Sequence, residues 1–167
     1  SYNTTYDAFV VKLNPDGGHL WSTYLGGSDL DSGVDIVVDS EDNVLATGTT
    51  VSSGWVSGGY DTSQEGYYDA YVVKISPTGQ HLWSTYVGGN EDDSGRGIAV
   101  DSLDNVLVTG ETNSSGWVSG GYDTSFNGSD VGYGDAFVVK LSPTGGHLWS
   151  TYLGGSSAEL GYEIAVD

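Results

Sequence analysis

One phrase of seven residues recurs along the chain, and its spacing constrains the fold more than any other feature. Gly-His-Leu-Trp-Ser-Thr-Tyr occupies residues 18–24 and 146–152, and residues 80–86 repeat it with Gln in place of Gly. The tryptophans of successive copies are separated by 83 − 21 = 62 and 149 − 83 = 66 residues. Repeats of this length predict a modular array in which each unit is one supersecondary motif.

Each repeat contains four short segments typical of β-strands. Residues 7–13 are rich in aromatic and β-branched side chains and run into a Pro-Asp-Gly turn, and residues 19–25 alternate in character until Gly-Gly. After an acidic loop, two more apolar runs, 34–38 and 44–49, flank the turn 39–43. The connections are too short for crossover helices, so we predict an all-β fold with antiparallel sheets.

Tandem units of four antiparallel strands are typical of a β-propeller, whose rings have 4 to 8 blades. The chain would supply about 2.75 blades, so it would not close a ring alone. The predicted division is a linker tail at 1–5, blade 1 at 6–50, a Gly/Trp linker at 51–67, blade 2 at 68–112, a second linker with an insertion at 113–133, and blade 3 at 134–167 without its fourth strand.

Several phrases of the chain resemble the SBBP-type β-propeller repeat of bacteria and archaea. They are Asp-Ala-Phe-Val-Val-Lys-Leu at 7–13, Leu-Trp-Ser-Thr-Tyr-Leu-Gly-Gly at 20–27, Asn-Val-Leu-Val-Thr-Gly at 105–110 and Ile-Ala-Val-Asp at 164–167. The resemblance implies a large secreted or surface-anchored protein and offers no shared catalytic motif. We therefore expect an extracellular or cell-surface location.

The segment 76–83, Ser-Pro-Thr-Gly-Gln-His-Leu-Trp, also resembles the turn-and-tryptophan motif of quinoprotein propellers. That resemblance implies a packing role between neighbouring blades for Trp21, Trp83 and Trp149. Because the histidines and lysines recur at fixed repeat positions as well, we expect architecture rather than catalysis and predict that the chain is not an enzyme.

The charge balance restricts the partners. A net charge of −19, from 23 acidic and 4 basic residues, leaves little positive surface for phosphates. Nucleic acid is therefore excluded as a partner, and the chain has no apolar run of membrane-spanning length. Cations, above all calcium, fit such a surface better, and the sequence contains no Cys for thiolate sites.

A calcium site is one hypothesis for the acidic loops, because alternating carboxylates around a glycine supply the hard oxygen ligands that calcium needs. Solvated acidic loops are the competing interpretation. The candidate ligands are Asp29, Asp31, Asp35, Glu91 and Asp93.

The linkers offer a second candidate surface, since Ser-Ser-Gly-Trp-Val-Ser-Gly-Gly-Tyr-Asp-Thr-Ser occurs unaltered at 52–63 and 114–125. Its aromatic rings could stack on sugars while its carboxylates accept hydroxyl protons, as in a lectin pocket. Alternatively, the rings pin the linker to a blade. The candidate residues are Trp55, Tyr60, Asp61, Trp117, Tyr122 and Asp123.

N-glycosylation sequons begin at Asn3, Asn113 and Asn127. Triplets of this kind are common in a chain rich in Ser and Thr. Intact-mass spectrometry of native material would show whether these sites carry glycans.

The incomplete third blade leaves an edge that needs a partner. Two interpretations stay open: the chain is part of a longer propeller, or several copies associate, including head-to-tail into a fibre. The sequence thus predicts a non-catalytic structural or adhesive scaffold, with a glycan- or protein-binding propeller as the alternative.

Overall fold

The computed structural model describes residues 6–128 and 134–167, and every regular element there is a β-strand. No helix in this part of the chain is long and apolar enough to cross a membrane. The strands are β1 (Ala8–Leu13), β2 (His19–Leu25), β3 (Asp31–Val38), β4 (Val44–Thr50), β5 (Asp69–Ile75), β6 (His81–Val87), β7 (Asp93–Val100), β8 (Val106–Thr112), β9 (Asp135–Leu141) and β10 (His147–Leu153).

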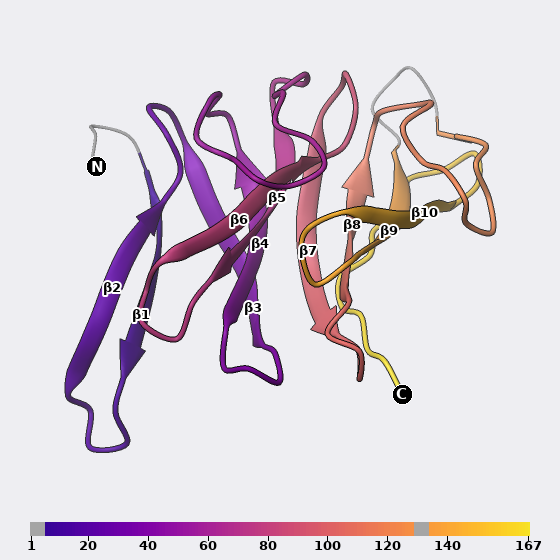
Figure 1. Cartoon of the computed structure of the whole chain (residues 1–167). Coiled ribbons are helices and arrows are strands. Elements are labelled where there is room, and N and C mark those ends of the chain that lie inside the picture. The colour runs from indigo at the N-terminus through magenta and orange to yellow at the C-terminus, as the bar shows by residue number, and fades with distance from the viewer. Residues whose placement is uncertain (1–5, 129–133) are drawn as a thin grey trace.

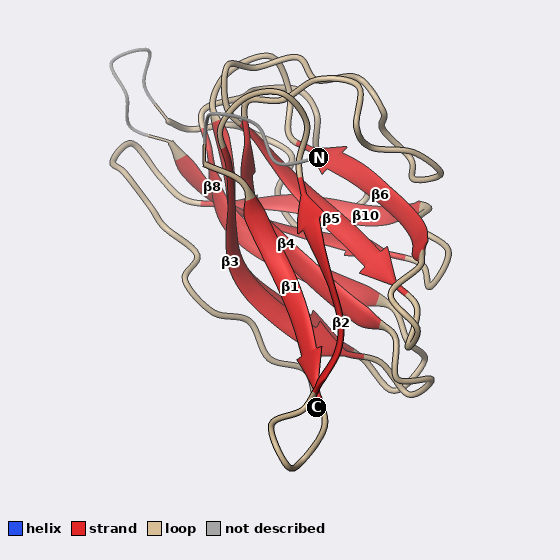
Figure 2. Ribbon diagram, turned by 90° about the vertical axis from the view of Figure 1, so that its left-hand side faces the viewer, coloured by secondary structure: helices blue, strands red, loops and turns tan. Residues whose placement is uncertain are grey.

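The strands form three antiparallel sheets that follow one another across the molecule (Figure 1). The first is the β1–β2 hairpin, the second has the order β3-β4-β5-β6, and the third has the order β10-β9-β8-β7. Figure 2 looks along the row, with the β1–β2 hairpin in front of the other sheets. This arrangement confirms the all-β prediction of unclosed, four-stranded propeller blades.

The sheets begin and end at other residues than the predicted blades. β4 pairs with β5 along seven residues without a bulge, so the predicted blades 6–50 and 68–112 each run from one sheet into the next. Likewise, β9 and β10 of the predicted blade 134–167 complete the sheet of β7 and β8. The long linker after β4 brings β5 back beside it, whereas the chain after β2 enters the next sheet. A periodic sequence fixes the length of a unit but not its starting point.

Residues 163–167 are a second departure, because blade 3 was predicted to have three strands, the third of them at 163–167, and the structure has no strand there. The segment instead packs against β8, where the Gly161 amide donates to the Gly110 carbonyl over 3.1 Å. A strand needs a neighbour for its ladder of hydrogen bonds. Within the described residues, no ladder of backbone hydrogen bonds joins this segment to a strand, although it lies against β7, where a Cβ at Gly97 would be 2.9 Å from the Glu163 Cα.

Apolar side chains fill the two spaces between the sheets. Between the first two sheets, Ala8 and Val10 belong to one cluster with Tyr71, Val73 and Ile75. The second space holds the larger cluster, made of Leu45, Ala70, Val72, Trp83, Val87, Ile98, Val106, Val108, Phe137, Val139 and Leu141. Burial on both faces explains why β5 is buried at every position while β1 alternates.

The turn between β3 and β4 is fixed by Asp39, whose Oδ1 accepts the Glu41 and Asn43 amides over 3.0 and 2.9 Å. The Lys74 ammonium lies 2.7 Å from Asp39 Oδ2. Burial disfavours the charged carboxylate, but the hydrogen bonds from Lys74 and Asn43 outweigh it and hold the pKa of Asp39 below its usual value. This turn is therefore tied to β5 of its own sheet.

Candidate functional site

Contacts from one sheet to the next are made by the tryptophan of the repeated phrase. The Trp21 indole donates to the Pro77 carbonyl over 2.9 Å, and the Trp83 indole donates to the Pro143 carbonyl over 3.0 Å. Each acceptor lies in the outer hairpin turn of the following sheet. The same hydrogen bond thus joins the first sheet to the second and the second to the third.

The turn that receives each indole ends in a glycine with a left-handed backbone. Gly79 and Gly145 have φ values of +85° and +82°, and a Cβ added there would lie 3.0 and 2.8 Å from the rings of Trp21 and Trp83. A side chain at either position would meet both backbone strain and the ring. The Pro-Thr-Gly turn is therefore a fitted socket for the indole.

A histidine and a serine of the same phrase are hydrogen-bonded in every copy. The Nε2–Oγ distances are 3.1 Å for His19 and Ser22, 2.9 Å for His81 and Ser84, and 2.9 Å for His147 and Ser150. Such a pair has the reach of a nucleophile and its base.

However, Ser84 Oγ also accepts the Ser57 amide over 3.0 Å, and Ser150 Oγ accepts the Ser119 amide over 2.9 Å. The serine therefore holds the preceding linker against the edge strand of the sheet. Burial lowers the pKa of His81 and of His147, so both rings stay neutral to a lower pH than usual.

The linker tryptophans lie between sheets and not on the surface of a loop. Trp55 Nε1 donates to Thr50 Oγ1 over 3.1 Å, and its ring meets the edge of Tyr71 at a centroid distance of 5.1 Å. Trp117 donates to Thr112 Oγ1 over 3.0 Å and packs on Phe137 at 5.3 Å. The two rings pin their linkers to the apolar layer.

One hollow of about 400 Å³ lies between the two linkers. Its wall includes the half-exposed Tyr60, with Asp61 and Glu65 from the first linker and Trp117 from the second. Residues 88–90 form its third side. An aromatic ring beside carboxylates in a concave surface suits a polyhydroxylated ligand.

Comparison with known protein families gives a match to the SBBP β-propeller repeat at residues 20–54 and again at 82–116. The chain contains two SBBP β-propeller repeats. No curated protein matches the sequence. Each SBBP match starts in the outer edge strand of one sheet, β2 or β6, and runs through two strands of the next sheet. The family repeat therefore spans the boundary at which the tryptophan docks.

Two of the predicted calcium ligands occupy one position of the SBBP repeat and are buried. Asp31 Oδ2 accepts the Gly27 amide and the Ser52 hydroxyl, both over 2.9 Å. Asp93 accepts Gly89 and Ser114 in the same way, over 2.8 and 2.9 Å. Burial raises the pKa of Asp93 to about 7 despite these hydrogen bonds. In both repeats the carboxylate joins the Gly-Gly loop to the start of the linker.

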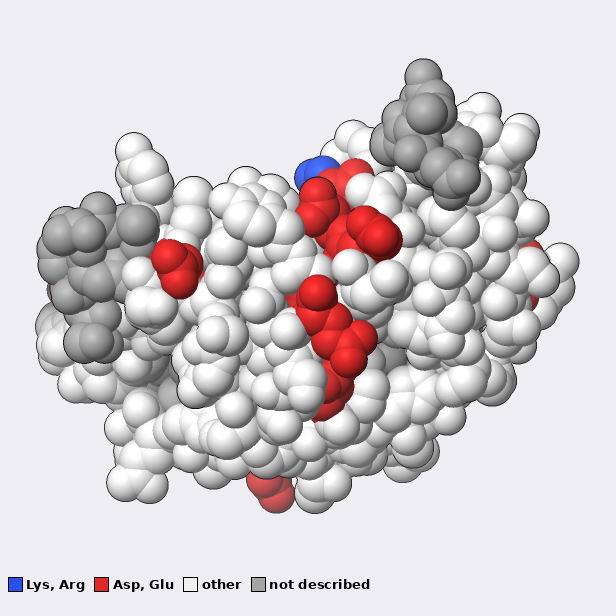
Figure 3. All heavy atoms as spheres, turned by 90° about the horizontal axis from the view of Figure 1, so that it is seen from above, with Lys and Arg blue, Asp and Glu red and all other residues white. Residues whose placement is uncertain are grey.

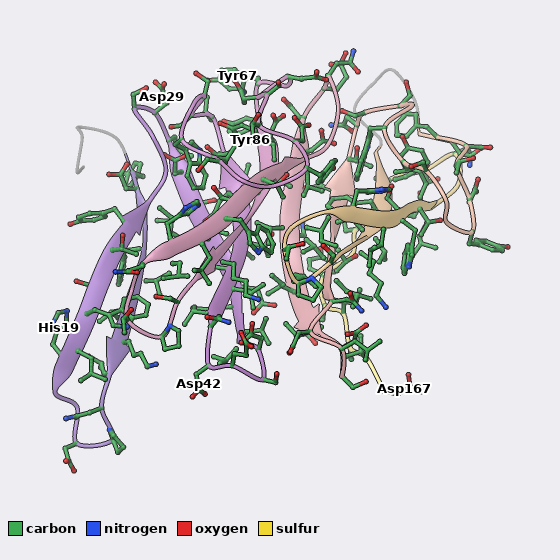
Figure 4. All side chains as sticks on the ribbon, viewed as in Figure 1. His19, Asp29, Asp42, Tyr67, Tyr86 and Asp167 are labelled. Atoms are coloured by element: carbon green, nitrogen blue, oxygen red, sulfur yellow. The ribbon has the colours of Figure 1, made fainter. Side chains whose placement is uncertain are left out.

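The other three predicted ligands lie apart from these carboxylates. Asp29 is exposed on the loop face, and the amides of Asp29 and Glu91 each donate to a serine hydroxyl over 2.8 Å (Figure 4). Asp35 is half-buried and accepts the Ile98 amide of the next sheet over 2.9 Å. In the described residues, no group of three or more His, Cys, Asp or Glu is placed to hold a metal. Calcium binding stays a prediction.

Acidic side chains nevertheless gather on the face that carries the loops, where Figure 3 shows them in a row across the middle of the surface.

The predicted sugar-binding carboxylates have local structural roles. Asp61 Oδ1 accepts the Ser63 amide over 2.9 Å, and the Asp61 carbonyl accepts the Tyr86 amide over 3.0 Å. Asp123 repeats both bonds with Ser125 and Tyr152, over 2.8 and 2.9 Å. Tyr122, in contrast, is 93% exposed.

The sequons fall in three different settings. Asn113 is exposed just after β8. Asn127 is exposed too: its backbone amide donates to Asp135 Oδ2, and its side-chain amide donates to the Ser125 carbonyl, both over 2.9 Å. Asn3 lies outside the described residues. Occupancy of these sites stays a prediction.

Sequence reasoning missed the acceptors of the docking interface, namely the carbonyls of Pro77 and Pro143. Their signal was present, because a Pro-X-Gly turn precedes every copy of the Trp phrase at a constant distance. Each turn is close in sequence to the tryptophan of its own sheet, but its carbonyl accepts the hydrogen bond from the tryptophan of the preceding sheet. Only the fold shows that offset of one repeat.

Proposed function

We propose that this chain is a non-catalytic structural scaffold of an extracellular or cell-surface assembly. The observation that carries the proposal is the use of the repeated polar groups. The tryptophan, histidine and serine of the repeated phrase, and the aspartates Asp31 and Asp93 that follow its first two copies, make the same structural hydrogen bonds in successive copies. Groups committed to the frame in every repeat are poor candidates for one reaction centre.

The extracellular setting rests on the acidic composition and the family resemblance. An acidic surface remains soluble at high ionic strength because counterions screen its self-repulsion. Protease shaving of intact native cells tests the location: accessible chain supports the proposal, and protection until lysis contradicts it. Intact mass of the same material reports glycans at Asn113 and Asn127.

A scaffold and a lectin predict different behaviour of the linker tryptophans. In a scaffold, Trp117→Ala lowers the melting temperature because the ring packs on Phe137 and Tyr152. Tyr122→Ser, in the same linker, is the matched control and leaves stability unchanged because Tyr122 is 93% exposed. A Trp117→Ala chain that keeps its stability but loses a bound glycan would overturn the scaffold proposal.

A glycan-binding propeller is the second candidate, favoured by the hollow of about 400 Å³ beside Tyr60 and Asp61. A glycan array probed with the intact chain tests it. Binding that is lost in both Tyr60→Ala and Asp61→Asn supports a lectin at the hollow. A blank array, or binding that neither change affects, removes this candidate.

A further inference from the structure

The two interfaces between sheets share a set of contacts, and that set can be followed residue by residue. In the interface between the second and third sheets, Trp83 and Lys74 both donate to the Pro143 carbonyl, over 3.0 and 3.2 Å. In the interface before it, Trp21 and Lys12 both donate to the Pro77 carbonyl, over 2.9 and 3.4 Å. One sheet supplies the indole and the ammonium, and the next supplies the turn.

A tyrosine from the linker adds a contact to the later interface. The Tyr60 ring lies 5.4 Å from the His147 ring of the third sheet, between centroids. Tyr60 belongs to the linker of the second sheet, so this contact also points from one sheet to the next. The donor side of an interface is therefore a tryptophan, a lysine and a linker tyrosine.

The third sheet presents the same donor side. Trp149, Lys140 and Tyr122 occupy the repeat positions of Trp83, Lys74 and Tyr60. Within residues 6–128 and 134–167, no turn receives the Trp149 indole, and Tyr122 is 93% exposed compared with 38% for Tyr60. Lys140 is held in place by Asp101 at 2.7 Å, as Lys74 is held by Asp39. The donor side of the third sheet is thus preformed.

The first sheet presents the matching acceptor side. A Cβ at Gly17 would have nothing within 4 Å, although Gly17 shares the φ of +82° with Gly145, which abuts Trp83. Pro15 precedes Gly17 as Pro143 precedes Gly145, and His19 corresponds to His147. Figure 4 shows His19 at the left-hand end of the molecule, on the hairpin that begins the row of sheets.

The strands behind this turn also expose an apolar face. Phe9 is 67% exposed, whereas Tyr71 and Phe137 at the same repeat position are 0% exposed. Leu13 is 52% exposed, against 2% for Ile75 and 0% for Leu141. In the second and third sheets these positions are buried against the sheet before. Within the described residues, the first sheet thus exposes side chains that the second and third sheets bury in an interface.

We propose that the third sheet of one copy docks against the first sheet of a second copy of this chain, head to tail. Trp149 and Lys140 donate to the Pro15 carbonyl of the second copy, and Tyr122 lies beside its His19. The proposal deepens the scaffold function proposed above and rests on it. Its partner is chosen by continuity, since the contact repeats an interface that the chain forms twice within itself.

The two faces of this interface differ, so the contact is heterologous and builds either a closed ring or an open filament. Each copy contributes two four-stranded sheets and one two-stranded hairpin, so a ring of two copies would hold four four-stranded sheets and two hairpins. Both partners carry a net charge of −19, and salt therefore favours association by screening their repulsion. Association that strengthens with added salt distinguishes this contact from one driven by ion pairs.

The first experiment is analytical ultracentrifugation with light scattering of the chain over a range of concentration and salt, followed by negative-stain microscopy. Dimers, rings or filaments that strengthen with salt are expected. A monomer at all accessible concentrations overturns the docking proposal. That result leaves the scaffold proposal standing, because glycan binding and stability test the scaffold separately.

Variants at the two faces then assign the contact. Trp149→Ser removes the indole, and Leu13→Arg places a charge at the position of Leu141, which belongs to one apolar cluster with Trp83 in the internal interface. Each change should weaken association by about thirty-fold, the size of a hot-spot residue. Tyr122→Ser is a second donor-side variant that cannot disturb the fold, and it should weaken association less. Tyr67→Ser is the matched control, because Tyr67 is 67% exposed and lies above the middle of the molecule, away from both ends of the row of sheets (Figure 4).

Mixing gives the decisive readout. Trp149→Ser and Leu13→Arg chains should each remain monomeric alone, yet together form a one-to-one dimer that grows no further, since one intact face remains on each partner. Formation of that dimer also shows that both variants are folded. Self-association unaffected by either change, or no dimer from two folded variants, would overturn the head-to-tail contact.

Discussion

Adding a single methyl group to the turn glycine can separate two contributions to stability: the packing of the turn against the indole and the backbone conformation of the turn itself. Gly145→Ala places a Cβ at 2.8 Å from the Trp83 ring, whereas Gly17→Ala places a Cβ in open space at the same backbone conformation, with φ of +82° in both cases. The pair therefore shares one local change and differs only in what the methyl group meets.

The magnitudes follow from that difference. A left-handed backbone costs a non-glycine residue roughly 1–2 kcal/mol, which both variants should lose. Overpacking against a buried ring costs about 1–3 kcal/mol more, and only Gly145→Ala should lose that amount. We expect losses of about 1–2 kcal/mol at Gly17 and about 2–5 kcal/mol at Gly145. Gly79→Ala, whose Cβ would lie 3.0 Å from the Trp21 ring, should fall between them.

The assay is equilibrium denaturation in urea, with a constant m-value as the sign that the unfolding reaction is unchanged. It is run at a protein concentration where the chain is monomeric, so that Gly17 stays open to solvent. Near-UV circular dichroism of the tryptophans checks that the loss at Gly145 accompanies a displaced indole. Equal losses at Gly17 and Gly145 would refute the idea that the turn is a fitted socket.

Two further predictions concern charged groups. Lys74→Met leaves the Asp39 carboxylate buried without its cation and should cost about 3–5 kcal/mol. Lys140→Met, at a more exposed pair, should cost clearly less. Urea denaturation measures both losses of stability, and equal losses would contradict the role of burial. Asp93 keeps its proton to about pH 7 when folded but only to about pH 3.8 when unfolded, so its contribution to stability falls as pH rises through that window. Asp93→Asn should reduce this decline in melting temperature, and an identical pH profile would refute the assignment.

The sequence predicts the content of the sheets better than their boundaries. Alternation and turn residues locate β1 and β2 to within one residue, since both depend on local chemistry. The pairing of β4 with β5 depends on a linker that folds back over the edge strand, where Gly58 bridges to Ser84. No local signal states that two strands separated by such a linker are neighbours. The predicted blades were therefore displaced by half a unit.

The candidate sites show the same division between local and distant partners. The turn 39–43 was predicted from local residue types, and its Asp39 accepts hydrogen bonds from residues two and four positions along the chain. Asp31 suggested a calcium ligand because its neighbours are acidic, but its hydrogen bonds include one to Ser52, far along the chain. The role of a carboxylate can be predicted from sequence when its hydrogen-bond partners are close along the chain. When the partners are distant in sequence, the role can be assigned only from the folded structure.

The unequal repeat lengths show which contacts fix the position of one sheet relative to the next. The second linker is longer than the first by 66 − 62 = 4 residues. Even so, Asp61 and Asp123 bind their edge strands alike, with bonds of 3.0 and 2.9 Å to Tyr86 and Tyr152. The docking bonds from Trp21 and Trp83 also agree, at 2.9 and 3.0 Å. The added residues therefore lie beyond Asp123, where they leave strand and turn unmoved. Because that position is fixed by a short turn and an indole, a second copy that presents Pro15 to Trp149 would be placed by the same geometry.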